Sequence, residues 1–242
     1  MITVSQKIET EINKFSDGST FRYEQLAIEP QEFFAATKAV ERLIAKGMIK
    51  RISTGIFYKP KKTIFGELKP SEQEVLKPYL FRKGKRIAYI TGTSLYNRLG
   101  LTTQIPKNIK IASKNKRITV SNEIVKASPI KSYVNVTDDN FYLLELLDVL
   151  KDFKKIPDLD KESAITIIIQ KLKDLNQKEV KLLIKYSLAY PPRVRAFLGA
   201  LLEKMFTKSD LSTLQKSLNP LSEYSYGINK DILPTAQNWK IK

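Results

Sequence analysis

Basic side chains are the residues of this sequence whose types and spacing point most directly to a chemistry. No Asp or Glu lies between Val75 and Asn122. The same stretch holds eleven basic residues: Lys77, Arg82, Lys83, Lys85, Arg86, Arg98, Lys107, Lys110, Lys114, Lys116 and Arg117. The whole chain carries a net charge of +17, and residues 61–135, with sixteen basic and four acidic residues, carry +12 of it. Charge of one sign destabilises a compact protein unless anions bind it, and the phosphate backbone of a nucleic acid is the predicted anion.

The residue types that most enzymes use are missing. The chain has no His and no Cys, which excludes Ser-His-Asp triads, cysteine nucleophiles, disulfides and Cys/His metal sites. Glu123 and Lys126 have the E-x-x-K spacing of some nucleases, but the nearest upstream acid is Glu74. A nuclease metal site needs several carboxylates close together. The sequence therefore predicts a protein that is not an enzyme and that holds no cofactor and no metal.

A second set of candidate contacts lies on a helix that is expected to begin near Pro30. One apolar stripe identifies it: Phe33, Ala36, Val40, Leu43 and Ile44. Gly47 is expected to end this helix in a left-handed conformation. Because the first turns of a recognition helix enter the major groove, the polar face supplies the predicted base and phosphate contacts. These contacts are Gln31, Thr37, Lys38 and Arg42, of which Arg42 is expected to meet the backbone.

Two short β-prone runs follow this helix, over residues 48–52 and 56–59, with Ser53-Thr54-Gly55 between them. This spacing predicts a β-hairpin. In a DNA-binding protein the hairpin would contact phosphate or reach the minor groove. The side chains predicted to do so are Lys50, Arg51, Thr54 and Lys59.

These elements predict the organisation of the whole chain. Helices over residues 4–15 and 21–27 precede the candidate recognition helix, so the order helix, helix, helix, hairpin predicts a winged helix-turn-helix over residues 1–62. A connector is expected from Lys61 to Pro78. A basic mixed segment (63–136) and a helical segment (137–242) follow, and residues 63–242 can also form one domain. The predicted class is α+β, with a mixed α/β segment of short antiparallel strands and a C-terminal helical bundle.

The mixed segment supplies the remaining candidate contacts. A short helix is expected over residues 94–99, and short antiparallel strands over four runs: 108–112, 117–121, 124–127 and 131–136. The predicted phosphate contacts in this segment are Lys85, Arg86, Lys114, Lys116 and Arg117. Four helices are expected in the last part of the chain, over residues 141–153, 161–175, 177–189 and 192–206, with a tail that packs across them.

Four strings of residues match a known family in the expected order along the chain. They are Arg51-Ile52-Ser53-Thr54-Gly55-Ile56-Phe57-Tyr58-Lys59-Pro60, Leu99-Gly100-Leu101-Thr102-Thr103-Gln104-Ile105-Pro106, Tyr190-Pro191-Pro192-Arg193-Val194-Arg195-Ala196-Phe197-Leu198-Gly199-Ala200-Leu201-Leu202-Glu203 and Leu218-Asn219-Pro220-Leu221. On these strings the chain resembles the AbiEi family, the antitoxins of AbiE-type toxin–antitoxin systems. No single string is specific, but together they span nearly the full length.

The resemblance implies an autoregulating repressor and antitoxin of a phage-defence system. The winged helix would bind double-stranded operator DNA. The C-terminal part would counteract a nucleotidyltransferase-like toxin encoded beside it. Arg193 and Arg195 lie inside the matched C-terminal string and are candidates for antitoxicity. A structural role, such as a bond from one of them to Glu203, is the equal alternative.

Two further interpretations stay open. The basic middle could hold tRNA or another RNA, with Tyr79, Phe81, Tyr89 and Tyr96 stacking on bases, although such aromatic residues are more often core residues. The N-terminal module, with a net charge of only +2, could also bind protein. The sequence has neither a signal-peptide core nor a long apolar run, so a cytoplasmic protein without membrane partners is expected.

Overall fold

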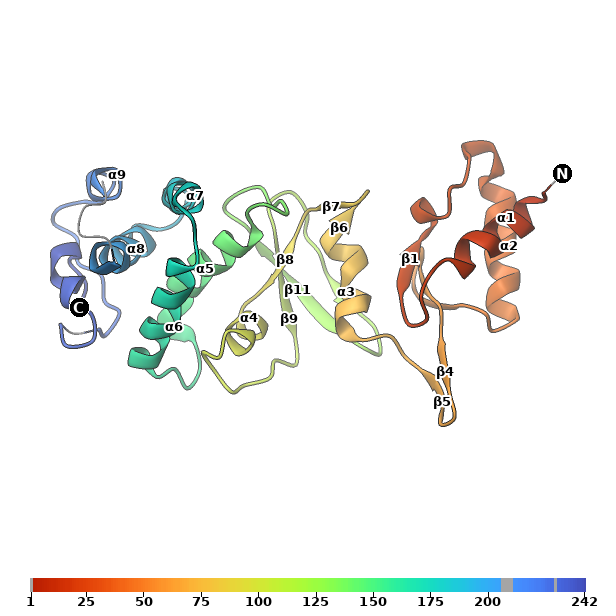
Figure 1. The fold of residues 1–242 in the computed structure, drawn as a ribbon, viewed down its shortest axis with the longest axis horizontal. Coiled ribbons are helices and arrows are strands. Elements are labelled where there is room, and N and C mark those ends of the chain that lie inside the picture. The colour runs from red at the N-terminus through yellow and green to blue at the C-terminus, as the bar shows by residue number, and fades with distance from the viewer. Residues whose placement is uncertain (1, 206–210, 229) are drawn as a thin grey trace. The chain divides into compact units, whose positions relative to one another are not determined.

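The computed structural model describes residues 2–205, 211–228 and 230–242. Contacts divide the chain into two compact units, here called the first unit (residues 1–86 and 120–126) and the second unit (residues 87–119 and 127–242). Figure 1 labels their helices and strands, which together give a mixed α/β structure. The division at residues 62 and 136 into three domains stays a prediction.

The first unit opens with helices and a small sheet that share one core. Its three strands have the order β1-β3-β2, and both pairings are antiparallel. Strand β1 lies between the two helices along the chain, and β2 and β3 follow the second helix. The elements are α1 (Val4–Asn13), β1 (Thr20–Arg22), the short 3-10 helices η1 (Tyr23–Gln25) and η2 (Pro30–Glu32), α2 (Phe33–Ala45), β2 (Lys50–Ser53) and β3 (Ile56–Tyr58).

The prediction of a helix over residues 21–27 is wrong, because this segment contains the end of strand β1 and the 3-10 helix η1. Phe21 pairs with Phe57 of β3, and both side chains are fully buried with their ring centroids 5.8 Å apart. The pairing joins residues far apart in the sequence, and such tertiary contacts override local helix propensity. The β1 segment therefore closes the sheet instead of adding a helix.

Helix α2 lies where a helix was expected, but it begins at Phe33 after the turn of η2. Its buried side chains are Ala36, Ala39, Val40 and Leu43. The expected stripe is wrong at Phe33, which is 52% exposed, and the neighbouring Phe34 is 77% exposed. Gly47 ends the helix with φ +69°, which confirms the predicted left-handed stop.

The segment expected as a connector, Lys61 to Pro78, instead forms a ribbon and a helix. The ribbon joins β4 (Lys61–Thr63) to β5 (Gly66–Leu68) and projects from the three-stranded sheet (Figure 1). Ile64 and Phe65 at its tip are each 93% exposed. Three more elements complete the first unit: α3 (Glu72–Leu80), the β6–β7 hairpin (Phe81–Arg82 and Lys85–Arg86) and β10 (Val120–Ser121).

Pro78 lies inside α3 without breaking it, for a reason that involves β1. A proline has no N–H, so it leaves the carbonyl four residues earlier, that of Glu74, without its helical donor. The Thr20 hydroxyl donates a hydrogen bond of 2.6 Å to this carbonyl. Arg22 in turn donates to the Pro78 carbonyl at 3.0 Å. The prolines of this segment predicted a connector. The helix forms instead because Thr20 of β1 satisfies the Glu74 carbonyl that Pro78 leaves free.

The second unit contains strands that differ from the expected antiparallel set. Strand β8 pairs antiparallel with β9, but β9 and β11 are parallel, with Ser113 opposite Lys131. The two short strands expected over residues 124–127 and 131–136 are replaced by the single strand β11, because Pro129 is accommodated within it. The elements are β8 (Tyr89–Thr91), α4 (Thr93–Arg98), β9 (Ile109–Ser113) and β11 (Lys126–Lys131).

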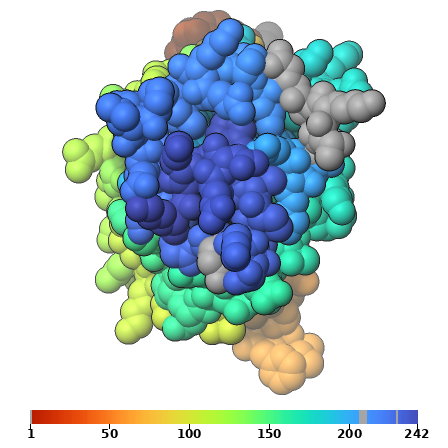
Figure 2. Space-filling view, turned by 90° about the vertical axis from the view of Figure 1, so that its left-hand side faces the viewer, coloured from red at the N-terminus to blue at the C-terminus, as the bar shows by residue number. Residues whose placement is uncertain are grey.

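Helices make up much of the rest of the second unit, and the four longest of them lie close to the expected positions. They are α5 (Phe141–Asp152), α6 (Lys161–Lys173), α7 (Gln177–Ser187), α8 (Pro192–Met205), α9 (Ser212–Lys216) and the 3-10 helices η3 (Phe153–Lys155) and η4 (Pro234–Trp239). The last residue of the helix expected over 192–206 lies outside the described residues. Figure 2 shows the face of the molecule on which the C-terminal residues, dark blue, lie at the centre, among the lighter blue and teal residues of the preceding helices. Trp239 packs against Gly199 of α8. None of the described helices is long and apolar enough to cross a membrane.

Candidate nucleic-acid interface

Helix α2 presents one exposed face, which carries predicted contacts together with the exposed Phe34. Lys38 and Arg42 are exposed on α2, and Gln31 is exposed in the preceding η2. Thr37 is half-buried, and its hydroxyl donates to the Phe33 carbonyl at 2.9 Å. The Lys38 ammonium pairs with Glu41 at 3.0 Å. The α2 residues of this set share one solvent-facing surface, with one cation partly neutralised by its neighbour.

The hairpin formed by β2 and β3 carries the next predicted contacts. Arg51 is exposed on β2, with its guanidinium carbon 5.7 Å from the centroid of the Phe57 ring. Thr54 is exposed in the turn. Lys50 forms an ion pair with Glu67 of the ribbon, and this hydrogen bond raises the pKa of Lys50 and lowers that of Glu67. The hairpin thus offers Arg51 as a cation with no carboxylate partner among the described residues.

Lys59 has a different environment from the other predicted contacts. Its ammonium pairs with Asp17 at 3.1 Å and donates to the Phe15 carbonyl at 3.2 Å. Both partners follow α1, so Lys59 fastens the end of that helix to the segment after β3. Its geometry favours a structural role over contact with DNA.

The basic segment 61–135 is divided between the two units. Lys85 and Arg86 lie on β7 of the first unit, where Arg86 stacks over Phe81 at 4.5 Å. The other three predicted contacts lie in the second unit, directly after β9: Lys114, Lys116 and Arg117. These three line one hollow of about 370 Å³ together with Lys131, which the sequence did not single out.

The two candidate antitoxin residues both contact main-chain carbonyls of the second unit. Arg193 is exposed and donates to the Lys151 carbonyl at 3.3 Å. Arg195 is half-buried and donates to the Ser217 carbonyl at 2.9 Å. The suggested partner Glu203 instead accepts from the Trp239 indole at 2.6 Å. Each arginine thus has a structural contact, and the role of both in antitoxicity stays a prediction.

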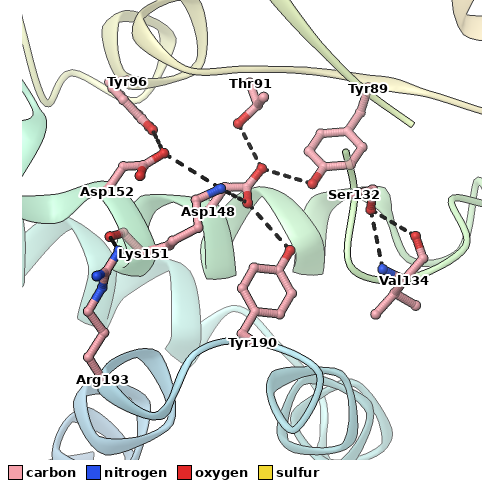
Figure 3. A network of polar contacts seen from close by, with 10 residues as sticks. All are labelled: Tyr89, Thr91, Tyr96, Ser132, Val134, Asp148, Lys151, Asp152, Tyr190 and Arg193. Carbon is pink, nitrogen blue, oxygen red and sulfur yellow. Dashed lines mark hydrogen bonds and ion pairs between the residues drawn. The ribbon is translucent and has the colours of Figure 1, made fainter. Parts of the chain in front are cut away.

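A buried polar network in the second unit was missed from the sequence. The Asp148 carboxylate on α5 accepts hydrogen bonds from Tyr89 and Thr91 of β8, each at 2.8 Å (Figure 3). It also pairs with Lys151 at 2.7 Å and lies 3.4 Å from the Tyr190 hydroxyl. No spacing in the sequence reveals such a network, because its members come from three separate segments.

The protonation of this network indicates a structural role. Burial raises the pKa of Tyr89, Tyr96 and Tyr190 well above the ordinary value of 10.0, and nearby carboxylates raise it further. Burial lowers the pKa of Lys151, but the charge and hydrogen bond of Asp148 and the charge of Asp152 act together against this effect, so the pKa is raised. The phenols therefore remain hydrogen-bond donors and Lys151 remains a cation. None of these groups is available as a base near neutral pH.

Comparison with known proteins places the chain in a family. A family model described as "Family of unknown function (DUF6088)" matches residues 7–139, more than half of the chain. The chain belongs to the DUF6088 family. No curated protein matches this DUF6088 chain. The resemblance to the AbiEi family stays a prediction, because the matching model is that of DUF6088.

The DUF6088 chain is similar over most of its length to a protein of known structure. It is the RV2827C protein from Mycobacterium tuberculosis, with a TM-score of 0.51 and 11% sequence identity. The alignment covers 93% of this chain and 85% of the mycobacterial chain. At this identity the likeness concerns the fold alone.

The structure also places the residues of the alternative interpretations. Glu123 of the DUF6088 chain is exposed and pairs with Lys69 at 2.9 Å. Among the described residues, no group of three or more acidic side chains could hold a metal ion. Tyr89 and Tyr96 are buried core residues, so they cannot stack on the bases of an RNA.

Proposed function

We propose that this chain is a sequence-specific DNA-binding autorepressor whose residues 1–62 form a winged helix-turn-helix. The observation that carries the proposal is the sheet order β1-β3-β2, with α2 connecting β1 to β2 and an exposed face of α2 that carries Lys38 and Arg42. A winged helix uses such a face as its recognition surface and the following hairpin as its wing. In the first unit η1 stands where the second helix of the motif is expected.

Base contacts are assigned to η2 and the first half of α2, and phosphate contacts to the second half of α2 and to other segments. Gln31, Thr37 and Lys38 are the proposed base contacts, and Arg42 and Arg51 the main phosphate contacts. Lys50 would have to release Glu67 before it could bind phosphate, and Lys59 keeps its place beside Asp17. The remaining proposed contacts are Thr54, Lys85, Arg86, Lys114, Lys116 and Arg117.

We further propose that the protein acts in the cytoplasm as an antitoxin that counteracts a nucleotidyltransferase-like toxin. The matched strings of the AbiEi resemblance support this proposal, and the string around Arg193 and Arg195 lies in the second unit. A direct test expresses the toxin gene adjacent to this chain's own gene, with and without the chain. Growth that is rescued by the full chain supports antitoxicity. Equal arrest in both cultures contradicts it.

The repressor proposal is tested by a gel-shift titration of the full chain on the DNA upstream of its own gene. Scrambled DNA and tRNA serve as competitors. If about six phosphates are neutralised, affinity should fall by roughly a thousandfold between about 50 and 200 mM salt. Preferential, salt-sensitive binding to the upstream DNA supports the repressor.

Two outcomes would contradict the repressor proposal. Equal binding to scrambled DNA would remove the sequence-specific part, whereas stronger binding to tRNA would favour the RNA-binding alternative. Lys14→Ala controls for the loss of one exposed positive charge away from the proposed contacts, since Lys14 is exposed at the end of α1 and pairs only locally with Glu11. This variant should bind the upstream DNA as the parent does.

A further inference from the structure

The second unit has a hollow at one end of its two parallel strands. Because β9 and β11 are parallel, with Ser113 opposite Lys131, the carboxyl ends of both strands meet at the same edge. The end of β9, the turn after it and the last three residues of β11 line a hollow of about 370 Å³ there. In sheets with parallel strands, the carboxyl edge is a common place for ligands.

The lining of this hollow is cationic. It includes four basic side chains, Lys114, Lys116, Arg117 and Lys131, and contains no acidic residue. The Lys114 ammonium donates a hydrogen bond of 2.8 Å to the Tyr133 carbonyl. In the part of the chain that the structure describes, Lys116, Arg117 and Lys131 form no ion pair. Four like charges around one hollow repel one another unless an anion lies between them.

The donors suit a phosphate group, which offers several oxygen acceptors around one centre. Arg117 offers a planar fork that binds phosphate oxygens in pairs, and the lysines add charge-assisted hydrogen bonds. The side-chain amide of Asn115, also in the lining, adds a neutral donor. The volume of the hollow exceeds that of a single phosphate group, so a second phosphate or a sugar can enter with it.

We propose that this hollow is a phosphate-binding site for nucleotides or polynucleotides. The phosphate can come from a free nucleotide or from the backbone of a nucleic acid. Lys114, Lys116 and Arg117 are also among the proposed operator contacts. The inference goes beyond that proposal because the hollow belongs entirely to the second unit and would bind phosphate whether or not α2 reads DNA. A chain that binds no operator would still have this site.

The test measures binding of magnesium-free probes to the full chain by isothermal titration calorimetry. The probes are pyrophosphate, a nucleoside triphosphate and a short single-stranded oligonucleotide. The hollow variant carries Lys116→Gln, Arg117→Gln and Lys131→Gln. The control variant removes the same charge from exposed positions of α7, with Lys178→Gln, Lys181→Gln and Lys185→Gln.

We expect the hollow variant to bind about tenfold more weakly or worse, because charge-assisted hydrogen bonds are lost, while the control stays within about twofold of the parent. Binding of the two small probes identifies a nucleotide site. Binding of the oligonucleotide alone identifies a backbone site. Equal weakening in both variants would overturn the inference, since it would mean that the overall charge attracts the probes. Absence of probe binding to the parent chain would also overturn it.

Folding and operator binding are controlled separately. The three replaced residues are exposed, so circular dichroism of the hollow variant should equal that of the parent. Lys131→Arg keeps the charge and should retain binding. Lys116 and Arg117 are also proposed operator contacts, so the repressor proposal is judged by the gel shift of the parent chain on upstream DNA. The hollow is judged by binding of the small probes, so either proposal can fail while the other stands.

Discussion

Asp148 joins three parts of the second unit through one side chain. Its carboxylate on α5 accepts from β8 and from Lys151, and it lies within reach of Tyr190 after α7. The residue is 2% exposed. A buried ion pair contributes little net stability, but removal of one partner leaves an uncompensated charge. Lys151 would carry that charge if Asp148 were neutralised.

Asp148→Asn is therefore expected to lower the free energy of unfolding of the second unit by about 3 kcal/mol. Lys151 keeps a weak partner in Asp152 at 3.6 Å, which limits the loss. Guanidinium unfolding followed by circular dichroism measures the effect. The control is Asp158→Asn, an exposed position with φ +51° that asparagine tolerates. Equal loss in both variants would contradict the role of the network.

Lys38 and Lys116 should differ in what they contribute to binding. Lys38 lies on the proposed recognition face, so Lys38→Ala should relax sequence preference at one or two positions of the operator. Lys116 is a proposed phosphate contact, so Lys116→Ala should weaken all sequences alike and reduce the salt slope by about 1. Binding to a library of operator variants at two salt concentrations separates these effects. If both variants behave identically, the assigned roles are wrong.

At the scale of elements, α8 and η4 meet at Gly199. A Cβ atom at this position would lie 2.2 Å from Cζ3 of Trp239. Alanine in a helix interior is normally more stable than glycine by about 1 kcal/mol. Here the overlap should dominate, and Gly199→Ala should destabilise the second unit by about 2 kcal/mol. Thermal unfolding followed by circular dichroism measures this change.

A double variant tests the cause of that loss. Trp239→Leu removes the ring, so alanine at position 199 should then be neutral or favourable. The two substitutions should therefore be strongly non-additive. A Gly199→Ala protein as stable as the parent would show that η4 shifts freely on α8.

Elements with local signals were predictable from the sequence, and elements that depend on distant partners were not. The amphipathic helices α1, α2 and α5 to α8 lie close to their expected positions because helical periodicity is local. Strand β1 was missed because it depends on Phe57, and α3 was missed because Thr20 satisfies the carbonyl that Pro78 leaves free. The parallel pairing of β9 and β11 has no signal in either strand.

The candidate site followed the same rule. The charge run identified Lys114, Lys116 and Arg117 because they are close in sequence. Lys131 escaped notice because only the β9–β11 register brings it to the same hollow. Sequence spacing also predicted that Lys59 contacts DNA, but its ion pair with Asp17 makes this contact unfavourable.

At the scale of the whole molecule, the stability of the second unit should depend on pH above about pH 10. The folded unit retains the protons of Lys151 and of Tyr89, Tyr96 and Tyr190 above the pKa values of the unfolded chain, which are 10.5 and 10.0. Unfolding therefore releases protons in this range, and stability falls as pH rises. Each group contributes up to about 1.4 kcal/mol per pH unit.

Denaturant unfolding between about pH 8 and pH 11 should show this loss, with little change contributed by these groups below about pH 9. Tyr89→Phe removes one titrating group, so its stability should fall less steeply with pH. Absorbance of tyrosinate in the native protein should show that the buried phenols do not ionise before unfolding. A slope unchanged in Tyr89→Phe would contradict the assignment.

Trp239 is the only tryptophan of the chain, and it lies 2% exposed in the second unit with its indole N–H bonded to Glu203. Indole emission moves to longer wavelength when water reaches the ring. Selective excitation therefore reports the second unit and is silent about the first, which has only tyrosine and phenylalanine. The protein carries a natural optical label on one half, so emission and circular dichroism recorded on one sample can time the unfolding of the two units separately.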